Sequence, residues 1–206
     1  MTNGEAGALS SYLFRHGVVM AGVDEKKQFV PLKIAVLTIS DTRSLKDDKS
    51  GAILVQRVVA AGHVVAERSI VTDDVEAIRA RVKAWIDDPV IDVVITTGGT
   101  GFTGRDVTPE AVEPLFEKKM DAFSALFLVI SFAKIGTSAI QSRATAGVAG
   151  STFIFCLPGS PGACKDAWDE ILVHQLDYRY GPCNFVEIMP RLDEHLRRPK
   201  AQGATA

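Results

Sequence analysis

Apolar and polar residues alternate along this chain in blocks that match the lengths of strands and helices. A continuous β-rich run covers residues 34–40, and further strands are predicted at 64–71, 91–96 and 152–157. Runs of this kind are typical of parallel strands that are covered on both faces. Segments with helical periodicity lie between them, and strands that alternate with helices predict a parallel sheet with right-handed connections.

Capping residues predict where the first two helices begin. Ser50 precedes a helical run that ends at Gly62. Asp73 precedes a second helix, which continues to about Asp87, and Glu76 completes a capping box at its start. Short polar side chains at such positions accept a hydrogen bond from the free amides of the first helical turn.

One proline marks the start of the third predicted helix, and another marks a bend in it. Thr108 is the expected N-cap, and Pro109 and Glu110 give a suitable first turn. Pro114 lacks the amide that a helical hydrogen bond requires, so the helix should bend there.

An apolar helix is predicted at 122–135, where Gly136 ends it. Its apolar run at 122–133 is shorter than the roughly 20 residues that cross a bilayer, so we expect a buried helix or a subunit interface and no membrane span. A last, amphipathic helix follows a turn at 158–161 and reaches Leu176.

Length and composition predict one globular domain. The chain has 206 residues, of which 47% are hydrophobic and 23% are charged, as in ordinary globular proteins. We expect this domain at 31–190, with an N-terminal extension at 1–30 and a C-terminal tail at 191–206. The formal net charge of -2 disfavours a nucleic-acid partner, because nucleic-acid binders usually carry a basic footprint.

The cysteines favour a cytoplasmic protein. Cys156, Cys164 and Cys183 form no CxxC pair and no zinc spacing, and their odd number does not suit a disulfide framework. A reducing compartment is the simpler prediction. Residues 1–20 also lack the continuous apolar segment of a secretory signal.

A glycine-rich segment, TTGGTGFTGRDVTPE at 96–110, is the strongest candidate for a functional site. It joins the end of a strand to the start of a helix. Glycines in such a turn let backbone amides approach an anion closely, and a helix start favours negative charge. The segment therefore predicts a phosphate-binding turn.

Two common phosphate motifs resemble this segment without matching it. Gly99, Gly101 and Gly104 have the GxGxxG spacing of a dinucleotide site, but the helix begins later than that motif requires. A P-loop needs Lys and Ser or Thr where Arg105 and Asp106 stand. Asp106 has two open interpretations: it holds Mg²⁺ against bound phosphates, or it only stabilises the nearby helix start.

Loops that follow parallel strands meet at the carboxyl edge of a sheet. We therefore expect Ser40, Asp48, the glycine turn and the Gly159-Ser160 pair to face one crevice. The alternative for the acidic loop at 47–51 is a solvated turn with Ser50 as its N-cap. Arg143 has two interpretations of equal weight, a phosphate clamp or a partner of a surface carboxylate.

Other catalytic chemistry has little support. The four histidines, His16, His63, His174 and His195, lie far apart and form no HExxH pattern. No GxSxG elbow is present, and Cys156 within a strand is a better core residue than nucleophile.

With these motifs assembled, the chain resembles the molybdenum cofactor biosynthesis family that includes MoaB, MogA and the gephyrin G domain. The resemblance covers about 31–187. It rests on VLTISD at 36–41, DKSG at 48–51, the segment at 96–110, QSRATAGVAGST at 141–152 and LPGSPGA at 157–163. The MoaB branch is the most similar, through the whole of 135–160 and the LDYRYGPCNF sequence at 176–185.

The resemblance implies a three-layer α/β/α sandwich with a mostly parallel sheet, molybdopterin binding, and a homotrimer or a homohexamer made of two trimers. For active members it implies adenylylation of molybdopterin with ATP as co-substrate and Mg²⁺. It assigns catalysis and Mg²⁺ binding to Asp48 and Asp106. The nucleotide phosphates are assigned to the turn, and the pterin or its phosphate to a further set of residues. The residues for the nucleotide phosphates are Gly98, Gly99, Thr100 and Gly101. The residues for the pterin or its phosphate are Ser40, Ser50, Ser142, Arg143, Gly159 and Ser160.

RDVTPE at 105–110 matches the pattern of the active members, so the resemblance predicts retained activity. A second hypothesis is a non-catalytic molybdopterin-binding or scaffold oligomer of the same pathway, in contact with other proteins of that pathway. A third, dinucleotide-dependent oxidoreduction, requires NAD binding.

Overall fold

The computed structural model describes residues 21–197. The expectation about a secretory signal in residues 1–20, and most of the predicted C-terminal tail, lie outside this range. The division of the chain into a domain at 31–190 with two flanking segments stays a prediction.

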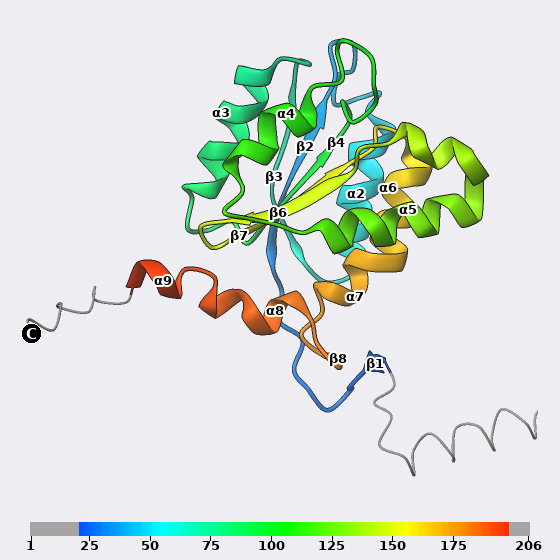
Figure 1. Ribbon diagram of the computed structural model, residues 1–206. Coiled ribbons are helices and arrows are strands. Elements are labelled where there is room, and N and C mark those ends of the chain that lie inside the picture. The colour runs from blue at the N-terminus through cyan, green and yellow to red at the C-terminus, as the bar shows by residue number, and fades with distance from the viewer. Residues whose placement is uncertain (1–20, 198–206) are drawn as a thin grey trace, which may run out of the picture.

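A six-stranded sheet forms the middle layer of the molecule (Figure 1), with strand order β3-β2-β4-β7-β6-β5. The four predicted strands are β2 (Lys33–Ile39), β3 (Val64–Val71), β4 (Val93–Thr97) and β7 (Thr152–Leu157), and they run parallel. β6 (Thr145–Ala149) and β5 (Lys118–Lys119) extend the sheet antiparallel. The mostly parallel α/β fold is thereby confirmed.

The sequence did not predict β6. Its residues are small, and Gly147 within it lies against the Phe116 ring: a Cβ on Gly147 would stand 2.3 Å from the ring's Cγ. Alanine and glycine have little intrinsic preference for strands, so the strand depends on its neighbours. β6 is a tertiary feature that local pattern does not reveal.

Helices cover both faces of the sheet (Figure 1). α2 (Lys49–Ala60), α5 (Asp121–Ile135) and α6 (Pro161–Ala167) lie on one face, and α3 (Val75–Ile86) and α4 (Thr108–Val112) lie on the other. Alternate residues of the strands feed the two cores. On β2, Ile34 and Val36 join the α2 side, whereas Ala35 and Leu37 join the α3 side.

Three capping predictions need correction. The N-cap of α2 is Asp48 and not Ser50, since the Asp48 carboxylate accepts from the amide of Gly51 at 2.9 Å. The N-cap of α3 is Asp74 and not Asp73. Thr108 is the first residue of α4, and its hydroxyl donates to the carbonyl of Gly98 at 2.8 Å.

Two further expectations concern a capping box at Glu76 and a bend at Pro114. Glu76 pairs with Arg79 at 2.6 Å in place of a capping box. The predicted bend at Pro114 is a change of helix type, because α4 gives way to the 3₁₀ helix η1 (Glu113–Leu115).

The C-terminal third of the chain is built from short pieces. The last predicted helix contains a π-helical segment, η3 (Trp168–Leu172), and continues as α7 (Val173–Gln175). α8 (Phe185–Ile188), η4 (Met189–Arg191) and α9 (Glu194–Arg197) follow. β8 (Tyr180–Gly181) pairs with β1 (Gly22–Val23), which ties the start of the described chain to its C-terminal third.

α5 is longer and less buried than its predicted counterpart. The 3₁₀ helix η2 (Gly136–Gln141) extends it, and the joint run Asp121–Gln141 is long and apolar enough, by length and composition, to cross a membrane. The expectation that this stretch is too short is therefore wrong. One face of α5 nevertheless packs on the sheet through Phe123 and Phe127, and Lys134 forms ion pairs with α6 and η3.

Candidate functional site

The loops after β2, β4 and β7 meet at one edge of the sheet, as predicted. Thr97 at the end of β4 donates from its hydroxyl to the carbonyl of Pro158 at 2.8 Å. A Cβ on Gly159 would stand 3.2 Å from the Cα of Gly98. From α2, the Ser50 hydroxyl donates to the Gly159 carbonyl at 2.8 Å. Ser50, Gly98 and Gly159 thus lie side by side at this edge of the sheet.

The glycine turn (residues 98–101) has a backbone that only glycine adopts readily. Gly98 and Gly99 have φ of +107° and +62°. A Cβ on Gly98 would stand 2.3 Å from the carbonyl oxygen of Ile39, and one on Gly99 would stand 2.4 Å from the Thr108 hydroxyl. The positive φ angles and close approaches explain the paired glycines.

Hydrogen bonds hold the turn in place from both sides. The amide of Gly98 donates to Leu157 at 3.1 Å, and the amide of Thr108 donates to the Gly99 carbonyl at 2.9 Å. Thr100 is buried. Within residues 21–197, no backbone acceptor takes the amides of Gly99 and Thr100. These two amides are therefore candidate donors for an anion.

Asp106 lies directly over this turn. Its Oδ2 accepts from the Thr103 amide at 2.9 Å and from the Thr103 hydroxyl at 2.7 Å. Partial burial opposes ionisation of the carboxyl, but these hydrogen bonds outweigh it, so the pKa of Asp106 lies below its ordinary value. The site therefore carries a half-buried, ionised carboxylate beside the turn.

Asp48 is enclosed by donors. Its Oδ2 accepts from the Thr38 hydroxyl at 2.7 Å and from Arg68 Nη2 at 2.9 Å, and its side chain is fully buried. Burial raises the pKa of this carboxyl, but the hydrogen bonds from Thr38 and Arg68 outweigh burial. The pKa of Asp48 therefore lies below its ordinary value. A direct Mg²⁺ contact from Asp48 does not fit this arrangement, because its oxygens are buried and already hydrogen-bonded.

The DKSG motif has a steric explanation in the same cluster. A Cβ on Gly51 would stand 2.2 Å from Asp48 Oδ2 and 2.6 Å from the Thr38 hydroxyl. Glycine at this position lets the carboxylate cap α2 and reach β2 at once. Arg68, on β3, was not found by sequence reasoning, since no local pattern connects it with Asp48.

Arg143 braces the glycine-rich segment. Its Nε donates to the Gly101 carbonyl at 2.8 Å, and its Nη2 donates to the Asp106 carbonyl at 2.7 Å. Its Nη1 pairs with the carboxylate of Glu110. Of the two interpretations, the structure shows the pairing with a carboxylate, together with two carbonyl contacts that the sequence did not indicate.

Arg105 ties the same segment to the loop after β2. Its Nε and Nη2 donate to the Asp41 carboxylate at 2.9 and 2.8 Å. Asp41 and Asp73 in turn exchange amide-to-carboxylate hydrogen bonds at 2.8 and 3.1 Å. Burial raises the pKa of Asp73, and the neighbouring Asp41 charge adds to this. Asp73 is thus a link between two loops and not a helix cap.

The predicted serines have separate roles. The hydroxyl of Ser40 accepts from the amides of Thr42 and Arg43 at 3.3 and 3.2 Å. Ser160 caps α6 by accepting from the amide of Ala163 at 3.2 Å. The buried Ser142 hydroxyl has no hydrogen-bond partner within the described residues.

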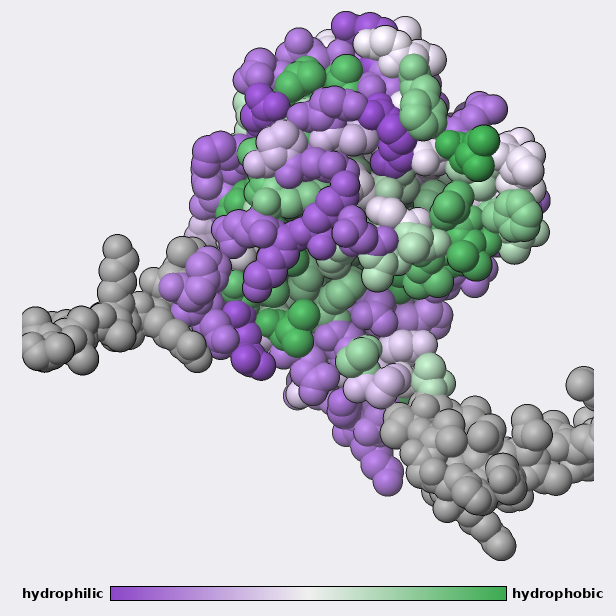
Figure 2. Space-filling model, viewed as in Figure 1, coloured by the Kyte–Doolittle hydropathy of each residue, from purple (hydrophilic) through white to green (hydrophobic). Residues whose placement is uncertain are grey.

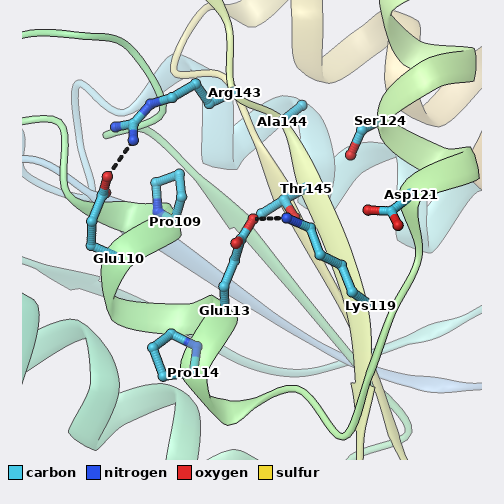
Figure 3. A pocket seen from close by; sticks show the side chains of 10 residues that line it. All are labelled: Pro109, Glu110, Glu113, Pro114, Lys119, Asp121, Ser124, Arg143, Ala144 and Thr145. Atoms are coloured by element: carbon cyan, nitrogen blue, oxygen red, sulfur yellow. Dashed lines mark hydrogen bonds and ion pairs between the residues drawn. The ribbon is translucent and has the colours of Figure 1, made fainter.

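A cavity of about 510 Å³ lies between α4, β6 and the start of α5 (Figure 3). Ion pairs stand in its wall, Arg143 with Glu110 and Lys119 with Glu113. The buried Thr145 hydroxyl, among its lining residues, lacks a partner in the described chain. An adjoining cavity of about 260 Å³ is lined by Ser142 and shares Arg143. Sequence reasoning missed the larger cavity because it did not predict β5 and β6.

Comparisons with known proteins agree with this geometry. Residues 35–178 match the family described as a probable molybdopterin binding domain. Molybdenum cofactor biosynthesis protein B of Escherichia coli (strain K12) is 49% identical over 158 residues, which cover 77% of this chain and 93% of that protein. The Bacillus subtilis (strain 168) protein of the same name is 42% identical over 157 residues, covering 75% and 92%.

Solved structures have the same fold. A crystal structure of a molybdenum cofactor biosynthesis protein B has a TM-score of 0.70 and 37% identity, covering 84% of this chain and all (100%) of that one. The tungsten cofactor synthesizing protein MoaB from Pyrococcus furiosus has a TM-score of 0.62 and 31% identity, covering 79% and 98%. The chain therefore belongs to the molybdopterin-binding domain family of molybdenum cofactor biosynthesis proteins.

Proposed function

We propose that this protein binds molybdopterin and adenylylates it with ATP and Mg²⁺, releasing pyrophosphate, before the metal is inserted. The observation that carries the proposal is the ionised Asp106 carboxylate held over a rigid glycine turn. Both stand at the edge where three strands end, and ligands of open α/β sheets bind at that edge. The family membership supports molybdopterin as the acceptor.

The reaction joins two polyanions. A terminal phosphate oxygen of molybdopterin attacks the α-phosphorus of ATP, the bond from that phosphorus to the bridging oxygen breaks, and pyrophosphate leaves. Positioning and charge neutralisation supply most of the catalysis in such transfers. The amides of Gly99 and Thr100 are suited to hold phosphate oxygens, and Arg143 keeps the loop that carries them in place.

Asp106 fits the requirements of Mg²⁺. This ion usually binds one or two carboxylates together with phosphate oxygens, and Asp106 offers an ionised carboxylate beside the turn. When bound, Mg²⁺ neutralises charge on the triphosphate and on the departing pyrophosphate. We assign Asp48 a different role, to position α2 and the loop before it by capping the helix.

The paired cavities beyond Arg143 are the proposed place for the pterin. The hydroxyls of Ser142 and Thr145 are buried and without partners in the described chain, and because both residues line these cavities, a rotation of either side chain would offer its hydroxyl to polar ring atoms. Arg143 lines both cavities and also contacts the glycine-rich segment. A ligand that spans pterin and phosphate is therefore expected to pass Arg143.

The homotrimer, or hexamer of two trimers, that the resemblance implies is proposed to use the outer face of α5 and η2 as its interface. Large apolar side chains are exposed there and gather over this part of the molecule (Figure 2): Leu126, Leu128, Val129, Phe132, Ile135 and Ile140. Contiguous apolar surface of this kind usually marks an interface. The same surface supports the second hypothesis, a non-catalytic molybdopterin-binding scaffold in contact with other proteins of the pathway.

We also propose a cytoplasmic location. The thiols of Cys156 and Cys164 are buried and free, and Cys183 is free and exposed. Burial raises the pKa of Cys156 to about 12, so this thiol is inert. Free thiols are typical of a reducing compartment.

The test measures pyrophosphate release from ATP, Mg²⁺ and molybdopterin. Asp106→Asn should abolish the release, because the amide keeps the shape of the side chain and removes its charge. Asp87→Asn, an exposed carboxylate at the end of α3, serves as the control and should release pyrophosphate like the unaltered chain. Molybdopterin binding without pyrophosphate release from the unaltered chain would favour the scaffold. Unchanged turnover in Asp106→Asn would show that Asp106 does not have the proposed role in Mg²⁺ binding and catalysis.

A further inference from the structure

Four arginines of the described chain reach the edge of the sheet where β2, β4 and β7 end, and three of them are neutralised by the protein itself. Each of these three has a carboxylate partner within hydrogen-bond distance. The pairs are Arg68 with Asp48 at 2.9 Å, Arg105 with Asp41 at 2.7 Å, and Arg143 with Glu110. A crevice that binds two polyanions needs a cation that is free to pair with phosphate, and these three arginines are already engaged.

Arg43 differs from the other three. Its nearest carboxylate oxygen is Asp48 Oδ1, at 3.9 Å, and Asp48 already pairs with Arg68. Its Nη1 makes only long contacts with neutral acceptors, 3.3 Å to the Ser50 hydroxyl and 3.4 Å to the Gly159 carbonyl. The side chain is 38% exposed. The guanidinium is therefore held weakly and in contact with solvent.

The place of Arg43 matters as much as its freedom. Its two contacts, Ser50 and Gly159, bond to each other, and Gly159 packs against Gly98, the first residue of the glycine turn. The guanidinium thus lies at the same edge of the sheet as the glycine turn, one contact away from Gly98 through Gly159. Guanidinium groups bind phosphate through paired, charge-assisted hydrogen bonds, which are stronger than bonds to a hydroxyl or carbonyl.

We propose that Arg43 binds the phosphate oxygens of the nucleotide, and that Arg143 does not. This inference rests on the proposed function and deepens it by naming the phosphate-binding cation. On ligand entry, the guanidinium exchanges two long contacts with neutral oxygens for shorter contacts with charged ones. Arg143 stays on the carbonyls of Gly101 and Asp106, where its loss would release the loop.

The test uses the full chain and two probes, inorganic pyrophosphate and ATP with Mg²⁺, in titration calorimetry. Arg43→Gln should weaken the binding of both probes about tenfold or more, the loss expected for a charge-assisted hydrogen bond. Arg43→Lys keeps the charge without the planar fork, so its affinity for each probe should lie between those of Arg43→Gln and the unaltered chain. Lys46→Gln, an exposed cation of the same loop, is the matched control and should bind both probes like the unaltered chain.

Several outcomes would overturn the inference. Affinities for Arg43→Gln within twofold of the unaltered chain would do so, as would equal losses in Arg43→Gln and Lys46→Gln, which would indicate a general charge effect. An unaltered chain that binds neither probe would overturn it together with the proposed function. The unaltered chain could also bind ATP without ever releasing pyrophosphate. If affinity then fell in Arg43→Gln and not in Lys46→Gln, Arg43 would still be the phosphate-binding residue, and adenylylation would be rejected.

Discussion

The carboxylate of Asp106 occupies the space that a side chain on Gly101 would take. A Cβ built on Gly101 would stand 2.7 Å from Asp106 Oδ2 and 3.1 Å from its Cγ. The same Oδ2 accepts two hydrogen bonds from Thr103. The glycine is thus required by the position of the carboxylate, five residues later in the same loop.

Gly101→Ala tests this relationship without touching a polar group. The added methyl should push the Asp106 carboxylate away from the turn, so pyrophosphate release should fall by about tenfold or more, as for a small misplacement of a positioning group. Gly104→Ala is the control, because a Cβ there meets no atom within 4 Å. Equal activity in the two variants would show that the contact is unimportant.

Arg143→Lys should loosen the glycine-rich segment. Lysine cannot reproduce the fork that reaches the carbonyls of Gly101 and Asp106 together with Glu110. We expect faster hydrogen exchange at the amides of residues 101–106, with the exchange of β4 unchanged. Arg57→Lys, which alters the pair between Arg57 on α2 and Asp169 on η3, should leave these amides as they are. Unchanged exchange in Arg143→Lys would contradict the bracing role.

Local pattern was sufficient for the parallel part of the fold. β2, β4 and β7 are nearly continuous apolar runs, and their burial on both faces is the physical reason for that pattern, whereas β3 lies at the edge of the sheet and is only partly buried. The N-cap of α3 could not be predicted from local pattern. Asp73 and Asp74 are equally good caps in sequence, and the structure selects Asp74 because Asp73 is hydrogen-bonded to Asp41, far away in the chain.

The same limit applies to the candidate site. The glycine turn and Asp106 were predictable, since turn, carboxylate and helix start lie within one short segment. The partners of Arg143 were not, because two of them are backbone carbonyls. Arg43 and Arg68 were missed for a related reason: their significance depends on which carboxylates the other arginines occupy.

Charge placed on the outer face of α5 should reduce the size of the oligomer. Phe132 is 58% exposed, and a glutamate there would put an unpaired carboxylate into the proposed apolar interface. We expect Phe132→Glu to have a smaller mass than the unaltered chain in light scattering coupled to gel filtration. Val59→Glu is the control, because Val59 is equally exposed at 59% and belongs to another helix, α2. Identical masses for all three chains would argue against this interface.

A buried histidine should make the fold sensitive to acid. His63 is 5% exposed, and its Nδ1 accepts from the amide of Leu32 at 3.1 Å, so the ring is neutral. Burial lowers the pKa of His63 to about 4, and the charge of Asp177 opposes this only in part. The unfolded chain, with an ordinary histidine pKa of about 6.5, takes up the proton first as the pH falls. Stability should therefore be fully present above pH 6.5 and decline between about 6.5 and 4.

For this histidine alone, the free energy of unfolding should fall by about 2 kcal/mol between pH 7 and pH 5. His63→Gln removes the titration and keeps an acceptor for the Leu32 amide, so its loss over this interval should be smaller by about that amount. His174→Gln, at a half-buried position, controls for the change in histidine content. Urea unfolding at the two pH values measures the difference. If His63→Gln lost as much stability as the unaltered chain between pH 7 and pH 5, His63 would not be the source of the acid sensitivity, because carboxylates such as Asp106 and Asp177, whose pKa values are lowered, act in the same direction only near and below their ordinary pKa of about 3.9.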